Sequence, residues 1–99
     1  MARHDVFKNP DGVGWLLDVQ TDLLEGLNTR IVVPLLPPDK APKPGRRLNP
    51  SFSVDGKEVL MVTQFLSAVP ERSLGESVAN LAARHDDIIA ALDMIVHGF

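Results

Sequence analysis

The sequence predicts a β-rich α+β domain, or a small barrel, in which antiparallel strands are followed by one C-terminal α-helix. Up to about position 70, short apolar runs alternate with turn-forming Pro, Asn, Asp and Gly, which is typical of strands. From about Ala82 to His97 the apolar residues recur at helical spacing instead. A length of 99 residues fits one domain. We therefore expect a single domain over residues 1–99, with strands within about residues 4–70 and a helix at about 82–97.

The N-terminal region predicts a hairpin with a long loop. His4–Lys8 and Trp15–Val19 are short apolar stretches, and the Asn9–Gly12 segment between them contains Pro and Gly, which favour a turn. The single Trp15 is expected in the core or at the rim of the sheet. Thr21–Leu27 is ambiguous, although it contains the apolar pair Leu23 and Leu24.

Thr29–Leu36 is the clearest strand, because it is a continuous run with three adjacent β-branched residues. Pro34 lies inside this run and predicts a bulge, an edge position or an early end, since proline cannot donate a backbone hydrogen bond. Residues 37–50 contain five prolines and four basic residues, and we expect a loop there.

A second hairpin is predicted by Ser51–Val54 and Glu58–Thr63, which flank the dipeptide Asp55-Gly56. Asp-Gly suits the type I′ turn, whose twist matches that of paired strands. Gln64–Val69 is expected to continue the sheet, and Pro70 to end it.

The C-terminal helix is predicted to be amphipathic. Counted at about 100° per residue, one arc gathers apolar residues and the opposite arc is polar apart from Ala90. The apolar arc contains Leu81, Ile88, Ile89, Leu92, Ile95, Val96 and Phe99. Asn80 is a candidate N-cap, and Gly98 suits the C-terminal stop.

The amino-acid composition argues against several classes of protein function. A net charge of −3 argues against a broad nucleic-acid surface, and the absence of cysteine removes disulfides and thiolate metal sites. No apolar run approaches the roughly 20 residues that span a bilayer, so we expect a cytoplasmic protein without membrane contact.

The three histidines give little sign of a chemical site. His4 is expected on the surface near the N-terminus, and His85 is expected to be hydrogen-bonded and partly buried. His85, Asp86 and Asp87 are consecutive and point in different directions on a helix, so they do not predict a metal site. No cofactor is expected.

Several segments, taken in order, resemble the CcdB toxins over essentially the whole chain. The segment Leu17–Leu24 resembles the second-strand signature of that family, and the similarity continues at Thr29–Leu35. It resumes in three short motifs and ends in a helix that leads to a free C-terminus. The three motifs are Leu48-Asn49-Pro50, Val62-Thr63-Gln64 and Ala68-Val69-Pro70.

The resemblance implies an SH3-like, strongly bent antiparallel sheet with a C-terminal helix, shared with the Kid and MazF toxins. It also implies a homodimer that binds the A subunit of DNA gyrase and traps the complex with cleaved DNA. Such a toxin catalyses no reaction, and a cognate CcdA-like antitoxin neutralises it.

The same resemblance implies which residues bind partners. Those expected to contact gyrase are the apolar pair after the second strand and the end of the helix, namely Leu23, Leu24, Asp93, Val96, His97, Gly98 and Phe99. Ile95 and Phe99 are expected in the dimer interface. Members of the family commonly end in Trp-Gly-Ile, whereas this chain ends in His97-Gly98-Phe99.

The antitoxin is expected to bind the first turn and the basic loop, because such antitoxin tails tend to be acidic. The residues predicted for this contact are Lys8, Asn9, Asp11, Gly12, Arg46 and Arg47.

Two other functions are compatible with the sequence. One is an endoribonuclease of the Kid/MazF type, for which Arg46, Arg47 and His85 are the candidate groups. The other is a binding protein that keeps the dimer and the antitoxin contacts but is not toxic, because His97 and Asp93 depart from the family pattern.

Overall fold

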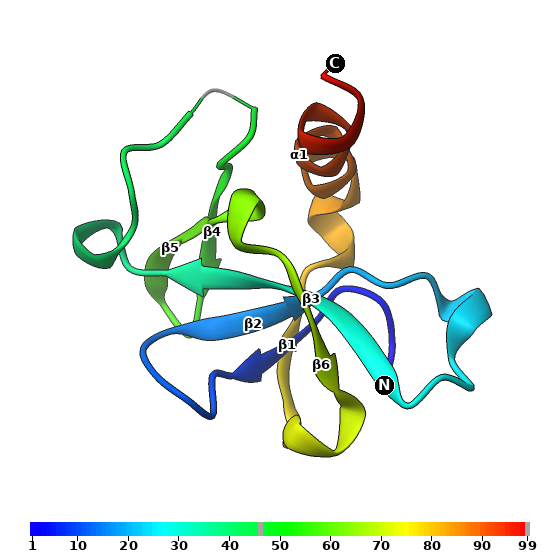
Figure 1. The fold of residues 1–99 in the computed structure, drawn as a ribbon. Helices are drawn as coiled ribbons and strands as arrows, with labels where there is room; N and C mark the ends of the chain where they lie inside the picture. The colour runs from blue at the N-terminus through cyan, green and yellow to red at the C-terminus, as the bar shows by residue number, and fades with distance from the viewer. Residues whose placement is uncertain (46, 99) are drawn as a thin grey trace.

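The computed structural model describes residues 1–45 and 47–98. Within them, seven strands form one curled antiparallel sheet in the order β4-β5-β3-β2-β1-β7, and β6 pairs with β3 beyond the end of β5. Helix α1 stands on one side of this sheet (Figure 1). The elements are β1 (Asp5–Lys8), β2 (Trp15–Asp18), β3 (Thr29–Leu36), β4 (Ser51–Val54), β5 (Lys57–Met61), β6 (Ser67–Pro70), β7 (Ser77–Asn80) and α1 (His85–His97). This architecture confirms the predicted fold class.

The predicted N-terminal hairpin is present. β1 pairs with β2 so that Val6 lies opposite Leu17, and the backbone amide of Asn9 donates to the carbonyl of Gly14 at 3.1 Å to close the loop. Gly14 has a φ of +84°, and a Cβ there would collide with the carbonyl oxygen of Leu35. This close approach to β3 therefore requires glycine.

β3 spans the predicted residues 29–36, and Pro34 does not end it. Residues 29–32 pair with β6, whereas Leu35 and Leu36 pair with β5. Pro34 lies where the partner strand changes, and its carbonyl accepts the amide of Val62 at 2.9 Å. Its missing N–H therefore falls where β3 passes from one partner strand to the other. Proline is tolerated there for the same reason as on an edge strand, because no partner strand needs the donor.

The second hairpin forms around the predicted Asp55-Gly56 turn, with left-handed φ angles of 54° at Asp55 and 74° at Gly56. Its second strand, β5, ends at Met61 and not at Thr63 as predicted, and a 3₁₀ turn at Thr63–Phe65 interrupts the segment expected to continue the sheet before β6 forms. The expectation that strands stop near residue 70 is wrong. β7 forms at Ser77–Asn80 and pairs with β1. A four-residue strand with exposed Val78 carries little local signal, and its formation depends on β1, which lies far away in the sequence.

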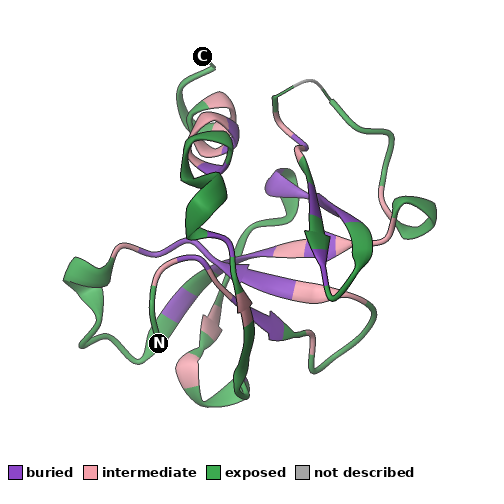
Figure 2. Ribbon diagram, turned by 180° about the vertical axis from the view of Figure 1, so that it is seen from behind, coloured by how far each residue is buried: buried purple, intermediate pink, exposed green. Residues whose placement is uncertain are grey.

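Alternate residues of the central strands bury on opposite faces of the sheet. Val6, Leu17 and Val33 belong to the main core beneath α1, whereas Phe7, Leu16 and Val32 form a smaller cluster on the other face. Figure 2 shows the buried residues concentrated in the central strands and on the inner side of the helix.

Helix α1 begins three residues later than predicted, after a single 3₁₀ turn at Ala82–Arg84. Asn80 is not the N-cap of α1, which is Arg84; its side chain instead accepts the amide of Ala82, the first residue of the 3₁₀ turn, at 2.8 Å. Ile88 and Ala91 are fully buried, but Val96 is 67% exposed because the end of the helix extends past the core. The helical spacing therefore predicts the buried side of the first turns and not of the last one.

Candidate functional site

The apolar pair predicted to contact a partner lies on a solvent-exposed loop, residues 21–27. Leu23 is 92% exposed and Leu24 46% exposed, on a 3₁₀ turn at Asp22–Leu24 that follows β2. The Thr21 hydroxyl accepts the amide of Leu23 at 3.3 Å, and the Asp22 carboxylate accepts the amide of Arg3 at 2.9 Å. The loop therefore presents two leucines to solvent with its backbone tied down.

A buried ion pair lies at the base of this loop. Asp18 in β2 and Arg30 in β3 are both fully buried, and a guanidinium nitrogen of Arg30 is 2.7 Å from a carboxylate oxygen of Asp18. Burial raises the pKa of the Asp18 carboxyl, and the hydrogen bond from Arg30 offsets this rise only in part. The sequence gives no sign of this pair, because the two residues fall within separate strands and nothing local marks them as partners.

The second predicted contact region is the end of α1. Asp93, Val96, His97 and Gly98 are all exposed. Gly98 adopts a left-handed φ of 79°, and its amide donates to the carbonyls of Asp93 and Met94, which closes the helix as predicted. Ile95, predicted for the dimer interface, is partly buried, and Phe99 lies outside the described residues.

The two predicted gyrase-contact regions lie apart within one protomer. Both Figure 1 and Figure 2 place the end of α1 at one extremity of the molecule and the 21–27 loop at its side.

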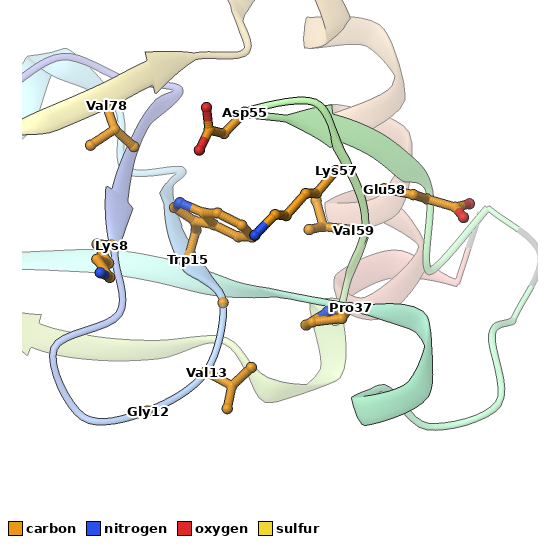
Figure 3. A pocket seen from close by; sticks show the side chains of 11 residues that line it. Lys8, Gly12, Val13, Trp15, Pro37, Asp55, Lys57, Glu58, Val59 and Val78 are labelled. Atoms are coloured by element: carbon orange, nitrogen blue, oxygen red, sulfur yellow. The ribbon is translucent and has the colours of Figure 1, made fainter.

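A pocket of about 700 Å³ opens at the rim of the sheet, between β7 and the β4–β5 hairpin (Figure 3). Trp15 lies at its centre in this view, and Val59 and Val78 add apolar surface. Lys8 and Lys57 supply positive charge, while Asp55 and Glu58 supply negative charge; Gly12, Val13, Gly14 and Pro37 complete the lining. Trp15 thus lies at the rim of the sheet, as predicted, and it also faces a cavity.

Two of the residues predicted for antitoxin binding, Lys8 and Gly12, line this pocket. Asn9 and Asp11 build the turn beside it, where the Asn9 side chain accepts the amide of Asp11 at 3.0 Å. Arg47 is exposed but does not line the pocket, and Arg46 lies outside the described residues. Trp15, Lys57 and Val78 were missed as a site because they come together only through long-range strand pairing.

The prediction of a surface position for His4 is wrong. His4 is 5% exposed, and its Nε2 is 2.8 Å from Nδ1 of His85 at the start of α1. His85 is hydrogen-bonded as predicted but is exposed, not partly buried. Burial lowers the pKa of His4, and the neighbouring Arg3 and His85 lower it further. The His4 amide donates to the carbonyl of Asp18 at 2.7 Å and its carbonyl accepts the amide of Leu81 at 2.9 Å. Its backbone is therefore held between two distant segments, which the sequence pattern does not reveal.

Within residues 1–45 and 47–98, no group of three or more His, Cys, Asp or Glu side chains is placed to hold a metal ion. In the same part of the chain, no helix has the length and apolar character needed to cross a bilayer.

The fold is that of a small α+β domain with a curled antiparallel sheet and one C-terminal helix, and comparison with known proteins identifies the family. Residues 3–98 match the family described as CcdB protein, so the chain belongs to the CcdB family. Membership in that family makes the chain a toxin of a toxin–antitoxin system.

One similar solved structure is described as "Endoribonuclease in complex with its cognate antitoxin from Mycobacterial species". The similarity covers 95% of this chain and 92% of that one, with a TM-score of 0.72 and 14% sequence identity. At this identity the similarity shows that the two proteins share a fold and nothing more.

Proposed function

We propose that this toxin acts as a homodimer that binds the A subunit of DNA gyrase in the cytoplasm and traps the complex with cleaved DNA. In this proposal the toxin catalyses no reaction. The observation that supports it most is the 92% exposure of Leu23 on a loop whose backbone is held by hydrogen bonds. Leu24 and Leu27 on the same loop are 46% and 48% exposed, and such a group of exposed apolar side chains is typical of a surface that binds another protein.

A homodimer is supported by exposed apolar side chains on another part of the surface. Phe65 is 53% exposed and Leu66 37% exposed, between β5 and β6, and Ile31 on β3 is 39% exposed. Because the 21–27 loop and the end of α1 lie apart in one protomer, pairing of two copies would also be needed to combine them. We expect the purified chain to elute as a dimer and to lose this state when Phe65 is replaced by Asp.

The test of gyrase binding compares Leu23→Ala with Val78→Ala, an exposed valine on β7 outside the predicted contact region. We expect wild type and Val78→Ala to co-elute with the gyrase A subunit and to stop growth on induction. Leu23→Ala should bind more weakly, and a chain ending at Val96 should fold but not kill. If the wild-type chain neither binds gyrase A nor arrests growth, the proposed function is wrong.

We further propose that a CcdA-like antitoxin binds beside the first turn, where the lining of the pocket includes Lys8 and Lys57. In this proposal the Trp15 ring contacts an apolar side chain of the tail, and the ammonium groups of Lys8 and Lys57, which Asp55 and Glu58 balance in charge within the lining, contact its carboxylates. Lys8→Glu is expected to weaken antitoxin binding and leave gyrase binding unchanged. Reversing the charge of Arg46 and Arg47 together tests the basic loop in the same assay.

Incubation with RNA in the absence of gyrase separates this function from an endoribonuclease. The proposal predicts no cleavage, and cleavage that is lost in His85→Ala would replace it with the enzymatic function. Normal growth on induction without antitoxin, combined with retained antitoxin binding, would instead indicate the non-toxic binding protein.

A further inference from the structure

We propose that Gln20 is a positioning residue that fixes the exposed leucine pair, Leu23 and Leu24, for partner binding. The inference rests on the proposed function, because it assigns the cause of the loop's defined shape to one buried side chain.

The Gln20 side chain connects the 21–27 loop to β3. Gln20 is 4% exposed. Its Oε1 accepts the amide of Ile31 at 3.1 Å, and its Nε2 donates to the carbonyl of Leu24 at 3.2 Å. The β2–β3 pairing ends at Asp18 and Val32. Beyond that point the Gln20 side chain supplies the hydrogen bonds that connect β3 to the loop.

Gln20 is itself held in place. Its backbone amide donates to one carboxylate oxygen of Asp18 at 3.0 Å, while the other carboxylate oxygen accepts from Nε of Arg30 at 2.8 Å. Asp18 and Arg30 are fully buried, so they are fixed by the core. The series of contacts therefore runs from the interior of the sheet to the carbonyl of Leu24.

Hydrophobic burial does not explain the position of the loop. None of the residues in the turn Asp22–Leu24 is buried, and residues 22–29 are all exposed. A loop of this kind loses conformational entropy on binding unless other interactions order it beforehand. The contacts of Thr21 and Asp22 hold the start of the turn from its exposed side. The hydrogen bond from Gln20, whose side chain is 4% exposed, holds the end of the turn, because it reaches the carbonyl of Leu24 itself.

Gln20→Glu removes the donor to the carbonyl of Leu24 and places a carboxylate at the buried position of Gln20. A glutamate keeps an oxygen that accepts the amide of Ile31 but presents no N–H to the carbonyl of Leu24. The matched control is Gln64→Glu, because Gln64 is exposed and uses its Oε1 as an acceptor from Asn49, which a glutamate preserves. Both variants carry the same change in charge.

We expect Q20E to bind the gyrase A subunit about three- to tenfold more weakly than wild type, as the loss of one hydrogen bond implies. Amide hydrogen exchange should be faster at residues 22–27 and unchanged in the β4–β5 hairpin. At lower pH the binding of Q20E should move closer to that of wild type measured at the same pH. The reason is that the introduced carboxyl group, once protonated, can again donate a hydrogen bond to the carbonyl of Leu24. Q64E should match wild type in all three measurements.

Equal gyrase binding by Q20E and wild type would overturn the inference. So would weaker binding without faster exchange at residues 22–27, because Gln20 would then act in another way. If wild type itself does not bind gyrase A, the proposed function fails, and the exchange measurement still decides whether Gln20 orders the loop. Gln20→Met, which has a similar volume and no polar donor, gives the same exchange test if Q20E is too unstable.

Discussion

Replacing Asp18 by Asn is expected to destabilise the domain by about 3–5 kcal/mol, because it leaves the buried Arg30 guanidinium without a charge partner. Arg30 is fully buried, and its Nη1 has no hydrogen-bond partner among the described residues even in the native protein. The Asp18→Asn side chain can still accept the amide of Gln20, which the native carboxylate accepts at 3.0 Å. The change therefore removes the charge and not the shape.

The size of the effect can be stated as a melting temperature. A domain of 99 residues unfolds with an entropy of about 0.2 kcal/mol/K, so this loss corresponds to a decrease of about 15–25 °C. The stability of such a domain is about 5–15 kcal/mol, so the variant keeps only part of it.

Urea unfolding of Asp18→Asn, Arg30→Met and the double variant would measure the pair directly. We expect the double variant to be more stable than the sum of the two single losses predicts, because it buries no charge. A loss below about 1 kcal/mol in Asp18→Asn would refute the reasoning, since it would mean that Arg30 finds water or another partner when Asp18 is neutral.

Two further predictions concern the helix and the histidine pair. Ile88→Ala should lower the free energy of unfolding in urea by about 2–5 kcal/mol, because Ile88 is fully buried. Val96→Ala, at a position that is 67% exposed, should change it by less than about 0.5 kcal/mol. Similar losses of stability in the two variants would contradict the packing of α1. The pKa of His4 is lowered from 6.5 by burial and by Arg3 and His85, so the folded state disfavours the charged form. Its contribution to stability is complete above 6.5 and is lost as the pH falls below that value. Unfolding measured between about pH 8 and about pH 5 should show this decrease, and His4→Asn, which tolerates the left-handed φ of 74°, should flatten it; an unchanged profile would count against the assignment.

The sequence predicts those elements whose signal is local. β3 is recognised from its β-branched run, and its observed bounds of Thr29–Leu36 agree with the prediction. The Asp55-Gly56 turn is recognised because few dipeptides accept two left-handed residues in succession. In both cases the residues that carry the signal are the residues that form the structure.

Features that depend on distant partners are not predictable in this way. β7 requires β1, and the hydrogen bond between His4 and His85 joins residues 81 positions apart. The same distinction between local and long-range signals applies to the residues of the candidate site. Leu23 and Leu24 are contiguous in the sequence and could be named together from the resemblance, whereas the pocket around Trp15 depends on residues of four strands, β1, β2, β5 and β7, meeting at the rim of the sheet.

The two outermost strands of the sheet, β4 and β7, are each four residues long. Every such border strand leaves backbone amides and carbonyls without a neighbour, and long ones invite the same strand of another molecule to join. A border of four residues offers too little ladder for stable growth of this kind. The brevity of these strands therefore opposes aggregation through the backbone, and in the proposed function it leaves partner recognition to side-chain surfaces such as the 21–27 loop.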